Sequence, residues 1–203
     1  MTKRPTVAVI GAGPGGIAMG IQLARGGYDF TIFDRNDGFG GTWLNNTYPG
    51  AACDVPSHFY SYSFALNPRW SKTFANQPEI LAYLEKVAAD YELARFLIPR
   101  TRVTALQWSD VDGRWTLVTA DGWTREFDIV VSAVGMLDVP NIPDIPGAER
   151  YNGRTFHSSN WDHSKSTAGE RVASIGTGAS AIQYVPAIAA DTAHLTVFQR
   201  TPI

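Results

Sequence analysis

The sequence predicts an α/β fold with two Rossmann-like dinucleotide-binding units, each built on a parallel sheet, and an antiparallel β meander inserted in the first unit. Three observations support this. A glycine-rich turn at residues 11–16 lies between a strand pattern and a helix pattern, and a second turn at 176–181 has the same context. Asp-Gly pairs at 112–113 and 121–122 indicate hairpin turns. One glycine turn is a weak signal, but a repeated strand–turn–helix unit is a strong one.

The first half begins with a β-branched strand at Thr6 to Ile10, a helix at 17–25 and a second strand at 29–33. Such a unit forms parallel strands with a right-handed crossover. Residues 35–76 show no sustained periodicity and are expected to form a long functional loop region. A helix is expected to begin at about residue 78 and run to residue 93, with one apolar face.

The remaining chain is expected to hold the meander, a buried strand, a linker and the start of a second domain. The meander strands are expected at 101–108, 114–120 and 123–127, the buried strand at 128–134, and later strands at 171–175 and 195–198. Pro186 is expected to kink or end the helix between the last two strands. The domains are expected to be a first domain at 1–138, a proline-rich linker at 139–150 and a truncated second domain at 151–203.

Composition excludes several classes. The 203 residues are 44% hydrophobic with a net charge of −2, so no basic excess favours nucleic acid binding. No apolar run approaches the roughly 18 residues of a membrane span. The single cysteine, Cys53, cannot form the thiol pair of a disulfide reductase, and it fits a reducing cytoplasm. No metal site is expected.

The first glycine turn has the residues needed to hold a pyrophosphate. Gly11 permits the tight turn, Gly13 lets the backbone approach the phosphates, and Gly16 lets the helix lie close to the strand. Asp34 follows Gly16 by 18 residues and is placed to accept a ribose 2′-hydroxyl, which selects an unphosphorylated adenosine. In the alternative interpretation, these glycines only make turns and Asp34 caps a loop. Gly15 and Arg35 are further candidate contacts.

The second turn carries Gly176, Gly178 and Ala181 in the permitted GxGxxA form. Arg200 stands 24 residues after Gly176, at the position where the first unit is expected to have its acid. A guanidinium there, with the hydroxyl of Thr201, suits a 2′-phosphate and favours NADP over NAD. An exposed arginine without a ligand is the alternative. The further candidate contacts are Thr177, Ala179, Ser180 and Gln183. Two dinucleotide sites together indicate hydride transfer from a nicotinamide to a flavin.

Two longer motifs are similar to those of the Baeyer–Villiger monooxygenases. Residues 40–54 read GGTWLNNTYPGAACD and match the family's Gly-Gly-x-Trp, Tyr-Pro-Gly and Asp positions. Residues 151–162 resemble the family fingerprint, with tyrosine in place of the usual first phenylalanine. Its residues here are Tyr151, Gly153, His157, Trp161 and Asp162. The resemblance covers essentially the whole chain and is to the N-terminal portion of the family.

The resemblance implies an FAD- and NADPH-dependent enzyme that inserts one oxygen of O2 beside a ketone carbonyl, by way of a flavin peroxide, to give an ester or lactone. It implies flavin contacts at Gly41, Thr42, Trp43, Asn45, Tyr60 and Val103. It implies that Ala52, Cys53 and Asp54 face the nicotinamide, with Asp54 as the active-site carboxylate. Asp54 would orient a cationic partner supplied by the missing C-terminal part of the enzyme. For His157 a structural, domain-coupling role is preferred to that of a general base.

Two other functions stay open at this point. A flavin-containing monooxygenase that oxygenates nitrogen or sulfur uses the same cofactors, although Trp161-Asp162 favours the Baeyer–Villiger type. A nucleotide-binding fragment without turnover of its own is the second, because the chain ends at Pro202-Ile203, soon after the second strand of the second unit.

Overall fold

A computed structural model describes residues 4–137 and 139–201 of the chain. The chain divides into two compact units, which we describe separately. The first unit contains residues 1–44, 61–67 and 80–138, and the second contains 45–60, 68–79 and 139–203. The sequence did not indicate that two stretches of the long loop region would group with the later residues.

The first unit is built on a parallel sheet with the strand order β3-β2-β1-β7. Its strands are β1 (Thr6–Ile10), β2 (Asp29–Phe33), β3 (Leu97–Ile98) and β7 (Ile129–Ser132). Helix α1 (Pro14–Arg25) connects β1 to β2, as the sequence predicted. The two-residue β3 was not predicted, because so short a strand has no periodicity to detect.

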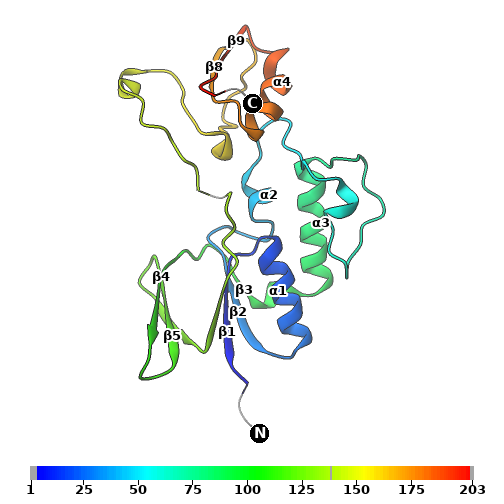
Figure 1. Ribbon diagram of the computed structural model, residues 1–203, viewed down its shortest axis with the longest axis vertical. Coiled ribbons are helices and arrows are strands. Elements are labelled where there is room, and N and C mark those ends of the chain that lie inside the picture. Colours follow the sequence, from blue (N-terminus) through cyan, green and yellow to red (C-terminus); the bar gives the residue numbers. More distant parts are fainter. Residues whose placement is uncertain (1–3, 138, 202–203) are drawn as a thin grey trace. The chain divides into compact units, whose positions relative to one another are not determined.

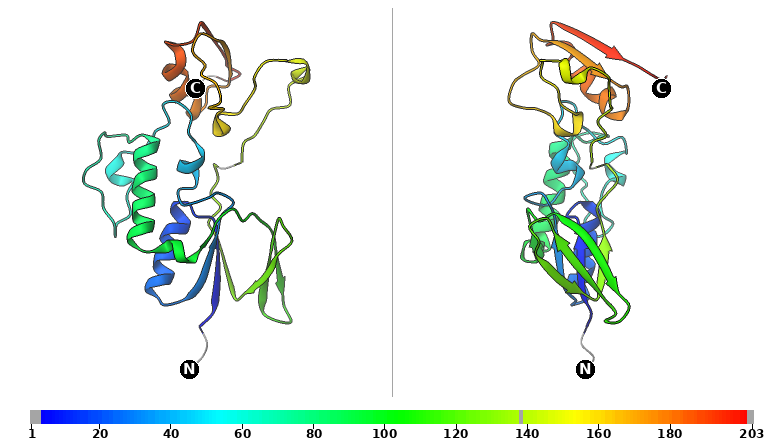
Figure 2. Two further views of the ribbon diagram at one scale, coloured as in Figure 1. Left: turned by 180° about the vertical axis from the view of Figure 1, so that it is seen from behind. Right: turned by 90° about the vertical axis from the view of Figure 1, so that its left-hand side faces the viewer.

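Helices α1 and α3 (Gln77–Asp90) lie on one side of this sheet, and the meander lies on the other (Figures 1 and 2). The meander consists of β4 (Val103–Ser109), β5 (Arg114–Thr119) and β6 (Thr124–Phe127), paired in that order and antiparallel. The predicted hairpin turns are confirmed, with Gly113 and Gly122 at positive φ. A 3-10 helix at Leu93–Phe96 follows α3.

Hydrophobic side chains fill both sides of the sheet. Ile17 and Ile21 of α1 are fully buried, as is Ile80 of α3. On the meander side, Phe33 of β2 meets Phe127 of β6 edge to face, with the ring centroids 5.8 Å apart. Burying each such side chain contributes about 1.5–3 kcal/mol, so the flanking layers hold the sheet in place.

The second unit contains a smaller strand–helix–strand repeat, made of β8 (Arg171–Ile175), α4 (Ala179–Ala189) and β9 (His194–Phe198). Strands β8 and β9 are parallel. Pro186 lies inside α4, which continues to Ala189, so the helix does not end at Pro186; the alternative expectation of a kink there stays a prediction. The unit also holds part of the short helix α2 (Thr42–Asn45) and 3-10 helices at Ser57–Phe59, Ala148–Arg150 and Ser158–Asn160.

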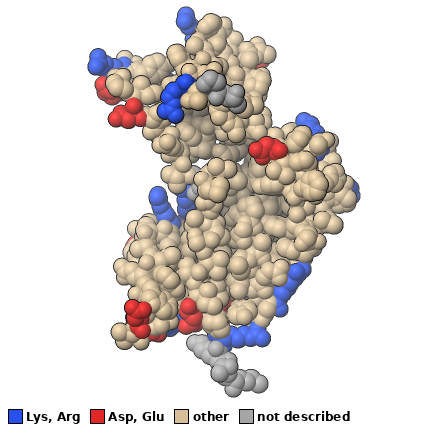
Figure 3. Space-filling view, viewed as in Figure 1, with Lys and Arg blue, Asp and Glu red and all other residues tan. Residues whose placement is uncertain are grey.

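The surface carries scattered charge. On the face shown in Figure 3, lysine and arginine side chains stand apart from one another and do not merge into one basic patch. Within residues 4–137 and 139–201, no helix is both long and apolar enough to cross a lipid bilayer.

Candidate dinucleotide sites

The first unit contains a cavity of about 420 Å³ at the carboxyl ends of its parallel strands. This edge of an open parallel sheet is where such folds bind their ligands. The predicted contacts that line the cavity are Gly11, Gly13, Gly15, Asp34, Arg35, Gly41, Thr42 and Val103. Residues from four separate stretches of the sequence therefore meet at one site.

Close backbone approaches explain the glycines of this turn. A Cβ at Gly16 would lie 1.8 Å from the carbonyl oxygen of Gly11, so Gly16 is what lets α1 start against the turn. A Cβ at Gly41 would lie 2.7 Å from the Cα of Gly13, so only a glycine at position 41 lets the Gly-Gly-Thr-Trp loop lie this close to the turn. Gly11 has a φ of +109°. Helix α1 begins directly after this turn, at Pro14, and the N-terminus of a helix suits a pyrophosphate.

Asp34 is buried at the end of β2 and lines the cavity. One carboxylate oxygen accepts the Ala12 N–H at 2.6 Å, and the other accepts the Asn36 N–H at 2.7 Å. The loop-capping alternative is therefore part of what Asp34 does. A carboxylate offers about four acceptor positions, so these two bonds leave room for ribose hydroxyls. The donors and acceptors present fit the adenosine half of a dinucleotide such as FAD.

Several lining residues were missed at the sequence level. Thr101 and Arg102 lie between β3 and the first meander strand, and residues 133–137 follow β7. A Cβ at Gly11 would lie 2.4 Å from the carbonyl oxygen of Ala133, which shows how closely β7 passes the turn. For residues 133–137 the available signal was that they follow a predicted strand of the parallel sheet, whose carboxyl end shares an edge with those of β1 and β2. No such signal existed for Thr101 and Arg102, because β3 was not predicted.

The second turn reproduces the first in backbone detail. Gly176 has a φ of +102° and donates its N–H to the Phe198 carbonyl at 2.9 Å, as Gly11 donates to Phe33 at 2.7 Å. In each unit the residue before the helix, Gly13 or Gly178, is extended. The predicted contacts Thr177, Ala179, Ser180 and Ala181 lie at this turn and in the first turn of α4. The repeat predicted from spacing is confirmed in structure.

The strand pairing corrects one detail of that prediction. Because Phe198 occupies the place of Phe33, the residue equivalent to Asp34 is Gln199, and Arg200 is equivalent to Arg35. Counting from the first glycine of each turn had aligned Arg200 with Asp34, one residue too far. The second strand–turn–helix repeat still has no acid at the position equivalent to Asp34, and the exposed residues Arg200 and Thr201 follow Gln199 directly. A neutral amide followed by a cation suits a 2′-phosphate.

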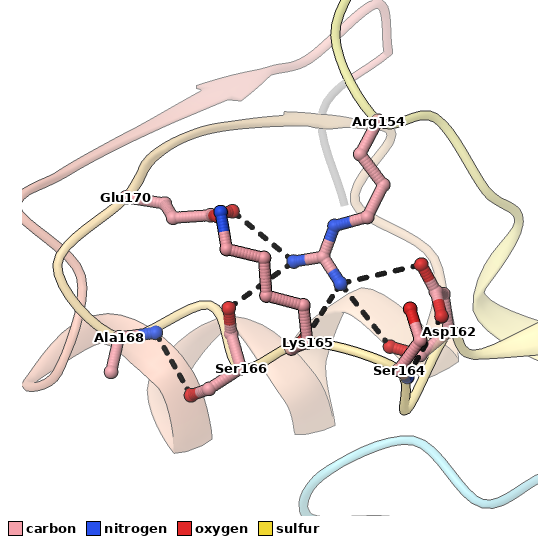
Figure 4. A network of polar contacts seen from close by, with 7 residues as sticks. All are labelled: Arg154, Asp162, Ser164, Lys165, Ser166, Ala168 and Glu170. Carbon is pink, nitrogen blue, oxygen red and sulfur yellow. Dashed lines mark hydrogen bonds and ion pairs between the residues drawn. The ribbon is translucent and has the colours of Figure 1, made fainter.

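The fingerprint segment is organised around Arg154, which the sequence analysis did not single out. Its guanidinium donates to the Asp162 carboxylate at 3.3 Å and to the Glu170 carboxylate at 3.1 Å (Figure 4). It also donates to the backbone carbonyls of Lys165, at 2.6 Å, and Ser166, at 3.3 Å. Arg154 therefore ties the start of the fingerprint to its end and to the residue before β8.

The other fingerprint residues have local roles. A Cβ at Gly153 would lie 2.2 Å from the Tyr151 ring, so the glycine makes space for the aromatic residue. His157 caps the 3-10 helix at Ser158–Asn160, its Nδ1 accepting the Ser159 N–H at 3.2 Å. Trp161 contacts Tyr184 of α4, with the ring centroids 5.4 Å apart. These contacts agree with the structural role preferred for His157.

The loop with the predicted carboxylate belongs to the second compact unit, as do Asn45, Ala52 and Tyr60. Cys53 donates its N–H to Ala75 at 3.0 Å, and its side chain is buried. Burial raises the pKa of the Cys53 thiol, with a smaller contribution from the charge of Asp54. Asp54 itself is exposed. Trp43 lies in α2, next to the cavity residue Thr42.

Two parallel sheets, each with a glycine turn leading into a helix, define a protein with two Rossmann-like units. The chain belongs to the pyridine nucleotide-disulphide oxidoreductase family, whose profile matches residues 8–203. It carries one cysteine, so a cysteine pair does not occur within it.

Individual relatives indicate a narrower class of protein than the family profile does. The chain is 51% identical to a Baeyer-Villiger monooxygenase of Streptomyces coelicolor and 48% identical to one of Pseudomonas aeruginosa, over 97% of the chain in both cases. It spans 38% and 37% of the lengths of these two relatives. A crystal structure of cyclohexanone monooxygenase superposes with a TM-score of 0.92 at 41% identity, covering 98% of this chain and 40% of that one. The resemblance to the N-terminal portion of the Baeyer–Villiger monooxygenases is confirmed.

Proposed function

We propose that the protein containing this chain is an FAD- and NADPH-dependent monooxygenase that converts a ketone to an ester or lactone. The observation that carries the proposal is the glycine cavity with buried Asp34 in the same chain as a second, acid-free glycine turn and the long Gly-Gly-Thr-Trp to Asp54 motif. Solved relatives support the cofactors: one cyclohexanone monooxygenase structure holds NADP+, and a structure called OTEMO holds FAD and NADP.

In this proposal, different residues of the chain bind the two dinucleotides. When bound, NADPH supplies a hydride and FAD passes the electrons to O2. Gly11, Gly13 and Asp34 hold the adenosine half and pyrophosphate of FAD. The turn at 176–181 holds the pyrophosphate of NADPH, and Arg200 with Thr201 selects its 2′-phosphate. Asp54 orients a cation contributed by residues outside this chain, which stabilises negative charge developing on the reacting oxygen.

The domain assignment follows from these sites. We assign residues 1–138 to the FAD-binding domain, 139–150 to the linker and 151–203 to the start of the NADP-binding domain by their function, although 45–60 and 68–79 group with the later residues in the second compact unit. The remaining contacts carried from the family, at Trp43, Asn45, Ala52, Cys53 and Tyr60, form part of the same proposal. We place the protein in the cytoplasm, because this chain carries a single cysteine and so forms no disulfide within itself.

An isotope experiment tests the reaction. The full-length protein, meaning the complete gene product that carries this chain, is purified with FAD and supplied with NADPH, cyclohexanone and 18O2. We expect a lactone that contains one 18O atom, with one NADPH consumed per lactone. A parallel reaction with a thioether tests oxygen transfer to sulfur.

The outcomes separate the candidate functions. Labelled lactone formed faster than sulfoxide supports the proposal. Sulfoxide without lactone from any of a panel of cyclic and linear ketones would show a heteroatom oxygenase. A folded full-length protein that binds no flavin would overturn the assignment of the first site.

A further inference from the structure

Three sequence motifs that lie far apart in the chain meet beside helix α4 in the second unit. The Tyr-Pro-Gly stretch contributes Tyr48, the fingerprint contributes Trp161, and α4 contributes Tyr184. Tyr184 contacts both of the other rings, with centroid distances of 6.2 Å to Tyr48 and 5.4 Å to Trp161. The Tyr184 hydroxyl also bonds Ser174 of β8 at 2.7 Å. The cluster thus connects the loop that leads to Asp54 with the strand that enters the second glycine turn.

Gln183 makes the polar contacts of this junction. Its Oε1 accepts the Tyr48 hydroxyl at 2.9 Å and the Ala52 N–H at 3.2 Å. Its Nε2 donates to the Ala52 carbonyl at 2.8 Å. The amide therefore pairs with the backbone of Ala52 in both directions, as a neighbouring strand would, and holds the tyrosine as well. Gln183, predicted as a cofactor contact, thus has its side-chain amide bonded to protein backbone.

The backbone at this contact is also close. A Cβ at Gly50 would lie 2.7 Å from the Gln183 carbonyl oxygen and 3.2 Å from the Ala187 side chain. Gly50 has a φ of +80°, which other residues rarely adopt. Segment 48–52 is therefore shaped to lie directly against α4.

Gln183 lies near the start of α4, close in sequence to the second glycine turn. Gln183 is the fifth residue of a helix that begins at Ala179, immediately after the glycine turn at 176–178. Ala52 is two residues before Asp54. One side chain thus joins the helix whose N-terminus faces the proposed NADPH pyrophosphate to the loop that carries the proposed catalytic carboxylate.

We infer that Gln183 is a positioning residue that couples nucleotide binding at the second turn to the conformation of segment 48–54. Nucleotide binding orders the start of α4, the Gln183 amide transmits that order to Ala52, and Asp54 is held in place for the reaction. By linkage, the same contact stabilises the bound nucleotide when the loop is ordered. The inference rests on the proposed function for the role of Asp54, and its first test does not depend on turnover.

Hydrogen–deuterium exchange on the full-length protein tests the coupling. The variant Gln183→Met keeps the length of the side chain and removes its hydrogen bonds, and Gln183→Glu keeps the acceptor but loses the donor. The matched control is Gln22→Met, the same change on an exposed position of α1. Exchange is followed in peptides covering 48–56, without ligand and with 2′-phospho-ADP-ribose, which has the NADP pyrophosphate but no nicotinamide ring.

In the unmodified protein and in Gln22→Met, we expect the probe to slow exchange in 48–56. In Gln183→Met, we expect exchange there to be about tenfold faster without ligand, because three hydrogen bonds are lost. We also expect the probe to lose its protective effect on this segment. Gln183→Glu should lie between the two. In turnover, Gln183→Met should lower kcat and ester formed per NADPH while the KM for NADPH changes less than threefold.

Two results would overturn the inference. The first is unchanged exchange in 48–56, or equal protection by the probe, in Gln183→Met. The second is a loss of NADPH affinity with unchanged exchange, which would make Gln183 a direct cofactor ligand. If the protein binds the probe but forms no ester from ketones, the proposed function fails while the exchange data still decide the coupling.

Discussion

Replacing Gly16 by alanine should destabilise the first dinucleotide turn, whereas the same change at Gly15 should not. The two glycines are neighbours in α1 and are both compatible with helix. A Cβ at Gly16 would lie 1.8 Å from the Gly11 carbonyl oxygen, but the nearest atom to a Cβ at Gly15 is the Ala133 methyl at 3.8 Å. The pair therefore separates a steric effect from the general effect of adding a methyl group.

The magnitude follows from the size of the clash. To reach the 3.0 Å that real Cβ contacts need, the start of α1 has to withdraw from the turn by more than 1 Å. Overpacking of this kind costs about 1–3 kcal/mol, and occasionally more. For a folding domain of 150–250 residues, 1 kcal/mol shifts the melting temperature by about 2–4 °C, so Gly16→Ala should lower it by roughly 2–12 °C. Gly15→Ala gains helix propensity, at most about 1 kcal/mol, and should keep or raise the melting temperature.

The assay is thermal unfolding of the full-length apoprotein, followed by titration with FAD. Gly16→Ala should melt lower than Gly15→Ala and bind FAD more weakly than the unmodified protein. Equal melting temperatures for the two variants would refute the reasoning, because they would show that α1 does not approach the turn as closely as the structure has it.

Two further predictions concern charged residues of the second unit. Arg200→Ala in the full-length protein should weaken NADPH binding about ten- to a hundredfold, because a charge-assisted contact of roughly 1.5–3 kcal/mol is lost. The affinity for NADH should change little. Equal losses of affinity for both coenzymes, measured by titration, would exclude a contact of Arg200 with the 2′-phosphate. Arg154→Met should lower the melting temperature at neutral pH, and the difference should shrink as the pH falls below about 4. The reason is that Lys165 first, and then Arg154, lower the pKa of Glu170, so the stabilisation is present above the pKa of the unfolded chain and is lost as the pH falls through the folded value. A difference independent of pH would mean that Arg154 acts through its backbone contacts alone.

Local sequence was enough to predict the longer helices and strands. Strand Asp29–Phe33 was predicted with the bounds that the structure shows, and the meander was located from its Asp-Gly turns. Both depend on short-range properties, namely side-chain alternation and the positive φ that the turn glycines adopt. Strand Leu97–Ile98 was missed because its two residues become a strand only by pairing with β2.

The site residues that were predicted depend on local sequence, and those that were missed depend on distant contacts. Gly11, Gly13 and Asp34 were found because the spacing of a dinucleotide turn is a local property of one strand–turn–helix unit. The error of one residue at Arg200 arose because counting along the chain cannot detect which residue of β9 bonds Gly176. Arg154 was missed because it bonds residues 8 to 16 positions away, and no motif spacing indicates such contacts.

The sequence by itself determined that the chain has two dinucleotide turns. It also determined the order of the longer strands and helices and the family whose motifs the chain shares, because each of these is encoded in residues close to one another. Only the tertiary structure decided which strand ends form the first cavity, that Gln199 rather than Arg200 takes the place of Asp34, and that Gln183 holds Ala52. These are contacts between residues up to 131 positions apart, and such contacts depend on how packed elements bring distant side chains within hydrogen-bond distance.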